Sequence, residues 1–268
     1  MTGQRTVQSR GGAAKARPAL EPLSLSIVLP CRNEEANVER VAREALKVGR
    51  RLARHLQVVI VNDGSTDRTG AIADELARAH PEVRVVHHET GRGYGGALRG
   101  GFGAATGEWV FYTDGDGQFE MGQLEGVLPL LREHDVVAGY RIKREDPSHR
   151  RLFGWAWSRV VWVVLGLRVR DIDCAFKVLP CWFVQSAPLR ASGAMISAEL
   201  LAHAKRQGLR LAQVGVHHRA RTGGRATGGN WRVIAKAMRE LVGLRRELRA
   251  GPPRSGGPLR NKEQGPGC

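Results

Sequence analysis

Residues 109–119 read WVFYTDGDGQF, an apolar run followed directly by two aspartates and a glutamine. Short apolar runs rich in aromatic and β-branched residues favour a strand that is buried on both faces. Side chains two residues apart on a strand share a face, so Asp114, Asp116 and Gln118 are expected to converge where the strand ends. Two carboxylates and an amide suit Mg²⁺ or Mn²⁺ that also takes oxygens from a substrate diphosphate. A polar turn that closes the strand explains the same residues equally well.

The same unit, an apolar strand followed by a polar loop, recurs along the chain. The other predicted strands are residues 25–30, 57–62, 83–88 and 135–139. Helical patterns separate them at residues 38–52, 69–79, 94–105 and 121–132. This alternation predicts an α/β fold, with a mostly parallel sheet between two layers of helices. Ligands of such sheets bind beyond the carboxyl ends of the strands, so the loops after the strands are the places to look for chemistry.

The chain has 268 residues, of which 42% are hydrophobic, enough for one good-sized core. We expect this core in a domain at residues 23–230, followed by a basic amphipathic helix at residues 231–250. Residues 1–22 and 251–268 are rich in Gly, Pro, Ser and Arg without apolar periodicity, so they are predicted to be disordered tails.

The formal charge of +16 is concentrated near the two ends, because residues 1–22 carry +3 and residues 221–268 carry +8. Such a distribution suits an anionic membrane surface, although a solvated and inert tail accounts for it almost as well. No recognised nucleic-acid-binding motif accompanies the charge, so nucleic acid is not an expected partner. The four cysteines lack metal-ligand spacing, and residues 1–24 lack the apolar core of a secretory signal. The expected compartment is the cytoplasm.

Two segments are candidates for contact with a membrane. Residues 152–167 carry three tryptophans but are interrupted by Arg159 and fall short of the roughly 20 apolar residues that a spanning helix needs. An interfacial helix and a buried core helix are both open interpretations. The helix at residues 231–248 has an apolar stripe and a basic side, which fits either a membrane face or packing on the core. The stripe consists of Trp231, Ile234, Met238, Leu241, Val242 and Leu248. A peripheral position on the cytoplasmic membrane face, without a spanning helix, is therefore expected.

Two of the polar loops suit a nucleoside. In NDGSTD, residues 62–67, Asp63 is placed to accept hydrogen bonds from a base or ribose, and Gly64 lets the backbone come close. Asn33 and Glu34, in the loop after the first strand, can serve the same nucleoside. Helix capping explains all three polar side chains equally simply.

A third loop, residues 89–96, contains the G-x-G-x-x-G spacing of dinucleotide-binding proteins. It follows the third strand rather than the first, and the acids downstream form a pair instead of a lone carboxylate. A phosphate-facing loop in which Arg92 meets a diphosphate is the favoured interpretation, with an oxidoreductase as the minor alternative.

Taken together, the four loops resemble those of family 2 glycosyltransferases, which have the Rossmann-like, three-layer fold called GT-A. The matching segments are PCRNE at residues 30–34, NDGSTD at 62–67, GRG at 91–93 and DGD at 114–116. The resemblance implies an inverting transfer from a GDP- or UDP-sugar that depends on Mg²⁺ or Mn²⁺. It also implies a set of residues that bind the nucleotide sugar. These are Pro30, Asn33, Glu34, Asn62, Asp63, Arg92, Gly93 and Asp114.

Within the family, the chain looks most like the dolichyl-phosphate mannosyltransferases and related polyprenyl-phosphate sugar transferases. That branch has D-x-D-x-Q, a G-x-R after the fifth strand, and D-x-T-S-G-F-R, which is approximated here by DIDCAFK at residues 171–177. The resemblance implies that Asp114, Asp116 and Gln118 hold the metal and that Arg141 binds a phosphate. It makes a polyprenyl phosphate at the membrane face the expected acceptor.

The chain departs from the family pattern at two places. Asn62 replaces the first aspartate of D-D-G-S, and R-x-x-G-x-S-K appears as RTGGRAT at residues 221–227, without its serine and lysine. Arg219, Arg221 and Arg225 are the candidates for holding an acceptor phosphate, since arginine makes bidentate phosphate contacts.

A hydroxyl acceptor is the alternative, and it would need a general base. Asp171 and Asp173 are the candidates for that base, with Glu199 as a third; a helix cap or a salt bridge accounts for each of these carboxylates as well. A noncatalytic nucleotide-sugar binder remains the last alternative.

Overall fold

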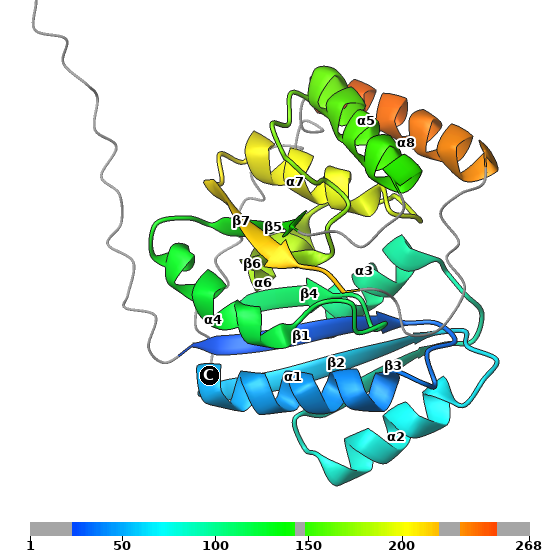
Figure 1. Ribbon diagram of the computed structural model, residues 1–268, viewed down its shortest axis with the longest axis vertical. Coiled ribbons are helices and arrows are strands. Elements are labelled where there is room, and N and C mark those ends of the chain that lie inside the picture. Colours follow the sequence, from blue (N-terminus) through cyan, green and yellow to red (C-terminus); the bar gives the residue numbers. More distant parts are fainter. Residues whose placement is uncertain (1–22, 143–147, 220–230, 251–268) are drawn as a thin grey trace, which may run out of the picture.

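The computed structural model describes residues 23–142, 148–219 and 231–250 (Figure 1). The predicted tails, residues 1–22 and 251–268, lie outside the described residues, as do Arg221 and Arg225.

A sheet of seven strands forms the centre of the described fold. The strands are β1 (Ser24–Cys31), β2 (His55–Asp63), β3 (Val83–His88), β4 (Trp109–Thr113), β5 (Val136–Ile142), β6 (Phe176–Pro180) and β7 (Leu211–His217). Their order is β3-β2-β1-β4-β6-β5-β7, and β6 runs antiparallel to both β4 and β5 while the other neighbours are parallel. The expected mostly parallel sheet is confirmed.

The central strands are buried on both faces, which explains their uninterrupted apolar sequence. In β1, Ile27 is fully buried between Val58 of β2 and Phe111 of β4, its partners in register. Leu25 and Leu29, on the same strand, are also fully buried. The core therefore lies along β1, β2 and β4, and the loops at their carboxyl ends are held by rigid strands.

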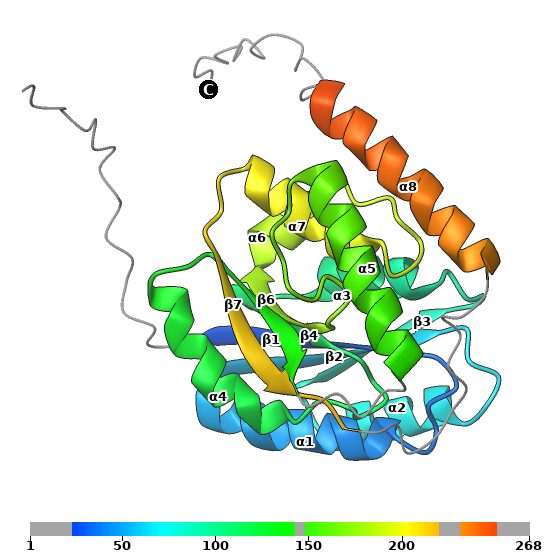
Figure 2. The same cartoon turned by 45° about the horizontal axis from the view of Figure 1, so that its top comes forward.

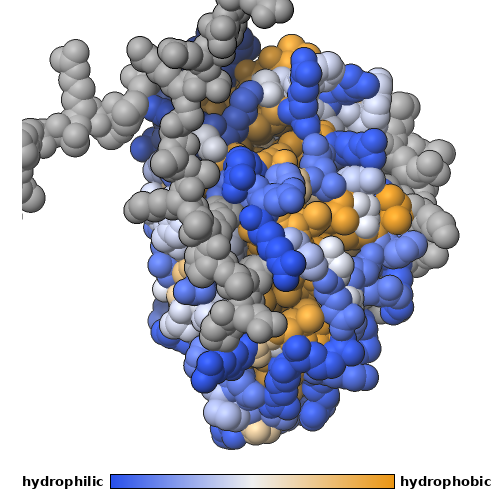
Figure 3. Space-filling model, turned by 90° about the vertical axis from the view of Figure 1, so that its left-hand side faces the viewer, coloured by the Kyte–Doolittle hydropathy of each residue, from blue (hydrophilic) through white to orange (hydrophobic). Residues whose placement is uncertain are grey.

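Helices cover both faces of the sheet (Figures 1 and 2). They are α1 (Val38–Leu52), α2 (Thr69–Ala79), α3 (Tyr94–Ala104), α4 (Leu124–Val127), α5 (Ser148–Leu165), α6 (Cys181–Ser186), α7 (Ile196–Arg206) and α8 (Trp231–Ala250). In both views α1 and α2 lie on one face and α3, α6 and α7 on the other, with α5 and α8 beyond α7. Figure 3 shows the face at the amino ends of the strands, where apolar patches alternate with polar side chains.

The single helix expected at residues 121–132 is wrong. Residues Met121–Gln123 and Leu128–Arg132 form 3-10 turns on either side of the four-residue α4. Pro129 lies at the start of the second turn and has no backbone N–H to donate. Gly122 and Gly126 also lower the helix propensity, so the local sequence does not support a continuous α-helix.

The C-terminal helix is present, but its apolar stripe is divided. In α8, Leu241 and Leu244 are buried against the rest of the fold, whereas Met238 and Val242 remain 40% and 43% exposed. Within the described ranges, none of the helices has the length and apolar character that crossing a bilayer requires.

Candidate active site

The loop that carries the two aspartates packs against the end of β1. Gly115 donates its N–H to the carbonyl oxygen of Pro30 at 3.3 Å. A Cβ on Gly115 would lie only 2.9 Å from that oxygen, so glycine is needed for the close approach. The contact places Asp114 and Asp116 directly beside the loop after β1.

The two aspartates form a concentrated negative site. Burial, and then the neighbouring charge of Asp116, raises the pKa of Asp114 to about 7. Asp116 is itself buried and accepts the N–H of Gln118 at 3.1 Å. The hydroxyl oxygen of Thr113, one residue before the pair, is buried without a hydrogen-bond partner.

These donors fit a hard divalent cation, which takes carboxylate and amide oxygens and offsets their repulsion. Across the described residues, no three His, Cys, Asp or Glu side chains group as metal ligands. Asp114, Asp116 and Gln118 are the residues that would hold such an ion.

Gln118 joins this loop to the segment after β7. Its side-chain nitrogen donates to the carbonyl oxygen of Arg219 at 3.0 Å, and Arg219 donates its N–H to the Gln118 carbonyl at 2.8 Å. The amide oxygen of Gln118 is therefore the side-chain atom available to a cation. The Arg219 guanidinium is ion-paired with Glu120, so this acceptor-phosphate candidate already has an anionic partner.

The loops after β1 and β2 are interlocked. Asn33, which has a positive φ of 55°, accepts the N–H of Thr66 at 2.9 Å and donates its own N–H to Ser65 Oγ at 3.0 Å. Glu34 donates its N–H to Thr69 Oγ1 at 2.8 Å, and its carboxylate accepts from Asn37 at 2.8 Å. Both predicted nucleoside residues thus shape the loops, and each has a structural partner.

Asn62 also has a structural partner in the second loop. Its side-chain oxygen accepts the N–H of Ser65 at 3.2 Å, and its nitrogen lies 3.1 Å from Nδ1 of His87. An amide at this position can both accept and donate, whereas an ionised aspartate can only accept. Asn62, in place of the aspartate of the family pattern, therefore holds the loop with an amide that both accepts and donates.

Asp63 holds the glycine loop that follows β3. Its Oδ1 accepts the N–H of Arg92 at 2.8 Å, and its Oδ2 accepts the N–H of Gly93 at 2.9 Å. Nδ1 of His88 lies 2.7 Å from Oδ1, and both side chains of this pair are only 4% exposed. The carboxylate is therefore oriented by the loop, and the exposed Arg92 side chain projects from a fixed backbone.

Glu199 supports the same loop from the other side. Its two carboxylate oxygens accept the N–H groups of Arg190 and Ala191, each at 2.9 Å. The following residue, Ser192, accepts the N–H of Gly95 at 3.0 Å. Burial raises the pKa of Glu199, although the two backbone hydrogen bonds oppose the rise. Both carboxylate oxygens of Glu199 are thus engaged by the backbone, and Glu199 positions the segment that contacts the glycine loop.

On the other side of β4, Arg141 and Asp171 form a bidentate ion pair. Nε and Nη2 of Arg141 lie 2.6 and 2.8 Å from the two carboxylate oxygens of Asp171. Burial disfavours the charged guanidinium, but the hydrogen bonds and charge of Asp171 outweigh it and raise the pKa of Arg141. Both carboxylate oxygens of Asp171 are therefore occupied by the Arg141 guanidinium.

Asp173 lies two residues further on and has different electrostatics. Burial, and then the charge of Asp171, raises the pKa of Asp173 to about 6, while Arg141 and a hydrogen bond from Trp157 oppose the rise. The fully buried Lys177 donates to the carbonyl oxygens of Ile172, at 3.2 Å, and Cys174. Lys177 thus anchors the turn that presents Asp173.

Two arginines near the site were missed by the sequence analysis. A Cβ on Gly91 would lie 2.7 Å from Nη1 of Arg32, and one on Gly117 would collide with the Arg40 guanidinium. Both arginines are exposed and lie over glycines of the substrate-facing loops. The sequence shows Gly91 and Gly117, but it does not show that an arginine packs against each of them. That contact depends on segments that are far apart in the chain.

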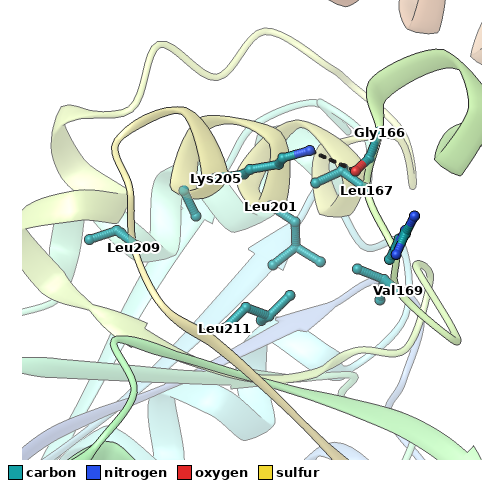
Figure 4. Close-up of a pocket in the computed structure, with 9 residues that line it drawn as sticks. Gly166, Leu167, Val169, Leu201, Lys205, Leu209 and Leu211 are labelled. Atoms are coloured by element: carbon teal, nitrogen blue, oxygen red, sulfur yellow. Dashed lines mark hydrogen bonds between the residues drawn. The ribbon is translucent and has the colours of Figure 1, made fainter. Parts of the chain in front are cut away.

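A separate apolar cavity of about 330 Å³ lies at the far end of α7 (Figure 4). Leu201, Leu209 and Leu211 point into it, and Lys205 closes one side by donating to the carbonyl oxygen of Gly166 at 2.7 Å. None of the predicted site residues lines this cavity.

The sheet order and the four loops define the GT-A class of glycosyltransferases, and solved structures share the fold. Glucosyl-3-phosphoglycerate synthase from Mycobacterium tuberculosis, solved with Mn²⁺, UDP and glucosyl-3-phosphoglycerate, superposes with a TM-score of 0.64 at 22% identity, over 92% of this chain and 88% of that one. Mannosyl-3-phosphoglycerate synthase from Rubrobacter xylanophilus gives a TM-score of 0.66 at 20% identity, over 88% and 79% of the two chains.

The model of glycosyl transferase family 2 matches residues 26–192, so the chain belongs to this family. Glycosyltransferase AglD of Haloferax volcanii is 29% identical over 76% of this chain and 35% of its own length. Dolichyl-phosphate beta-glucosyltransferase of Mus musculus is 28% identical over 58% and 54% of the two chains, and dodecaprenyl-phosphate galacturonate synthase of Rhizobium johnstonii is 26% identical over 87% and 70%. The matched part thus spans between a third and about half of the first two relatives.

Proposed function

We propose that this protein transfers a sugar from a nucleoside diphosphate sugar, GDP- or UDP-linked, to a polyprenyl phosphate at a membrane face. The observation that carries the proposal is the meeting of the Asp114–Gln118 loop with the end of β1 and with the segment after β7, near the Arg141–Asp171 ion pair. Relatives named for dolichyl-, undecaprenyl- and dodecaprenyl-phosphate support the choice of acceptor.

In this proposal, the loops after β1, β2 and β3 bind the nucleoside and diphosphate. Asp63 fixes the backbone from which Arg92 reaches the diphosphate, and Arg32 and Arg40 supply further positive charge at the rim. Asn33, Glu34 and Asn62 hold the loops in register, beside Pro30 and Gly93. These residues bind and orient the donor.

Asp114, Asp116 and Gln118 would hold Mg²⁺ or Mn²⁺. Such an ion supplies Lewis-acid stabilisation of charge that develops on the leaving diphosphate. The structures solved with Mn²⁺ and UDP support a divalent ion in this fold.

Arg141 would interact with a phosphate while Asp171 fixes its orientation. A phosphate monoester has its second pKa at about 6 and is already ionised at pH 7, so the acceptor needs no strong base. Arg219, Arg221 and Arg225 stay candidates for its phosphate. Glu199 acts as a positioning residue for the glycine loop.

A hydroxyl acceptor is the second candidate, because Asp173 has the properties of a general base. Its pKa of about 6 lies near the physiological range, and Trp157 and the turn anchored by Lys177 hold it in place. The similar solved structures are synthases of glucosyl- and mannosyl-3-phosphoglycerate.

One assay tests the proposal. A panel of GDP- and UDP-sugars is incubated with the protein and Mg²⁺ or Mn²⁺, with and without undecaprenyl phosphate, and lipid-linked sugar is measured by extraction. The proposal predicts a lipid product from at least one donor. Transfer to 3-phosphoglycerate or another hydroxyl compound without any lipid product would support the second candidate, and binding without transfer would indicate a noncatalytic binder.

A further inference from the structure

An open cleft of about 630 Å³ lies along α5, outside the site described above. We call it the α5 cleft. It is lined by Trp155, Ser158, Arg159, Trp162, Arg168, Val169 and Arg170. The combination of large aromatic rings with guanidinium groups distinguishes it from the leucine-lined cavity of Figure 4.

Arg159 and Arg168 of the α5 cleft lie over tryptophan rings. The Arg159 guanidinium carbon lies 5.3 and 5.1 Å from the ring centroids of Trp155 and Trp162, and that of Arg168 lies 5.6 Å from Trp162. A guanidinium that lies over an aromatic ring can still donate N–H groups to an anion. Among the described residues, Arg159, Arg168 and Arg170 form no ion pair with a carboxylate.

The outer side of α5 exposes two large apolar side chains. Trp155 is 56% exposed and Val163 is 76% exposed, and with the exposed Arg159 they occur every four residues along one face of the helix. Tryptophan favours the level of lipid headgroups, because it joins an apolar body to an N–H donor. This face therefore matches the boundary between a bilayer and water.

Arginines dominate the segment that lines the cleft, and the nearby Asp171 is already paired with Arg141. Residues 148–170 contain five arginines and no aspartate or glutamate. The neighbouring α8, which contacts α5 and lies beside it in Figures 1 and 2, exposes Met238 and Val242. The two glutamates of α8 interact with the 190–192 segment, through Ser192 and Arg190. The combination of exposed apolar side chains and unpaired positive charge is complementary to an anionic bilayer.

We propose that the α5 cleft binds the phosphate of an anionic phospholipid headgroup, with Trp155 and Val163 inserted at the bilayer interface. Arg159 and Arg168 would donate their N–H edges to the phosphate oxygens. This inference deepens the proposed function, since it names the surface that meets the membrane, but its binding test requires no turnover.

The same helix contributes to the acceptor side of the active site. Ser158 Oγ accepts the N–H of Ile172 at 3.5 Å, and Trp157 hydrogen-bonds Asp173. Docking through α5 would therefore bring the turn at residues 171–174 close to the bilayer surface, where a lipid-linked acceptor is found.

Vesicle flotation of the full chain tests the proposal. Binding to phosphatidylcholine vesicles is compared with binding to vesicles that also contain phosphatidylglycerol, both without polyprenyl phosphate. The phosphatidylglycerol vesicles should bind the protein more tightly, and Arg159→Gln should weaken that binding by about fivefold, the effect of one basic residue near an anionic surface. Trp155→Ala should weaken binding to the same vesicles.

Matched controls separate the cleft from general charge and exposure. Trp182→Ala changes a tryptophan that is also 56% exposed but lies on α6, and Arg54→Gln removes an exposed arginine before β2. Both controls should bind vesicles like the unaltered protein. Equal binding of Arg159→Gln, Trp155→Ala and the unaltered protein would overturn the proposal, as would equal binding to both kinds of vesicle.

A second measurement tests whether the α5 cleft binds the acceptor instead of a phospholipid headgroup. Turnover of a short-chain, water-soluble prenyl phosphate without any bilayer should be the same for Arg159→Gln and the unaltered protein. A large loss of this turnover would show that the cleft binds the acceptor itself, and would overturn the headgroup assignment. Absence of turnover in the unaltered protein contradicts the proposed function, while the flotation result still decides the cleft.

Discussion

At the scale of single residues, Asp171 and Asp173 illustrate how two neighbouring carboxylates acquire different chemistry. Asp171 is held by two hydrogen bonds from the Arg141 guanidinium, whereas Asp173 is half-buried, with a pKa raised to about 6. A paired carboxylate stays ionised and holds its partner, while one with a raised pKa can exchange a proton near neutral pH. The two therefore differ in what they can do for an acceptor.

Asp173→Asn separates the two acceptor classes. With a polyprenyl phosphate, turnover should stay within a few-fold, because the phosphate is ionised without help. With a hydroxyl acceptor it should fall by about 10²–10⁴-fold, the usual contribution of a general base. The measurement is kcat/KM with each acceptor, and Asp74→Asn, at a carboxylate paired with His87 on the surface, is the control.

The pH dependence of hydroxyl transfer is an independent test of whether Asp173 is the general base. Protonation removes the base, so hydroxyl transfer by the unaltered protein should fall as the pH drops through about 6, the pKa of Asp173. Asp173→Asn should lack this limb. An unchanged limb in the variant would rule out Asp173 as its source.

The sequence predicted which loops form the candidate site, but it did not predict which residues each side chain contacts. Asp63 was predicted to face a nucleoside, yet its oxygens accept from Arg92 and Gly93, which lie about thirty residues away in the chain. Arg40, which lies over Gly117, was not predicted as a site residue. Both features depend on which distant segments the fold brings together, and no local pattern encodes that.

At the scale of elements, α3 offers a matched pair of glycines. A Cβ on Gly95 would collide with the carbonyl oxygen of Ala191, whereas one on Gly103 would meet nothing within 4 Å. Gly95 also donates its N–H to Ser192, so it sets the distance between the glycine loop and the segment before α7. Tight packing at the start of α3 thus positions the glycine loop.

Gly95→Ala should destabilise the fold by about 1–3 kcal/mol through overpacking and weaken donor binding at the displaced loop. Gly103→Ala should instead stabilise the protein by roughly 0.5–1 kcal/mol, because alanine favours a helix. Denaturant unfolding and titration with a nucleoside diphosphate measure the two effects. If both variants behaved alike, the packing of α3 against residues 191–192 would not control the loop.

Elements with a strong local signal were predicted closely, and elements that depend on distant pairing were not. The helices at 38–52 and 69–79 and the strand at 83–88 have the predicted bounds, because period and burial determine them locally. Strand β6 was missed: its sequence, FKVLP, is short and follows the DIDC turn directly. Its antiparallel place between β4 and β5 depends on segments on either side of α5.

In the whole molecule, segments from nearly the full described length of the chain meet at the candidate site. The end of β1 contacts the Asp114–Gln118 loop, which in turn contacts Arg219 after β7. The fold and family predicted from the sequence are confirmed, whereas the roles of the site residues stay predictions. Most of the net charge lies near the chain ends, and α8, with six basic and two acidic residues, is the part of that charge which the structure describes.

The central claim is that the Asp114–Gln118 loop forms a metal-dependent site for a nucleoside diphosphate sugar. The most direct measurement is Mn²⁺- or Mg²⁺-dependent sugar transfer by the unaltered protein and by Asp116→Ala, with circular dichroism to show that the variant is folded. We predict that the unaltered protein transfers sugar and that chelation of the metal abolishes this transfer. The folded Asp116→Ala variant should show no transfer. Full metal-dependent transfer by Asp116→Ala would contradict it.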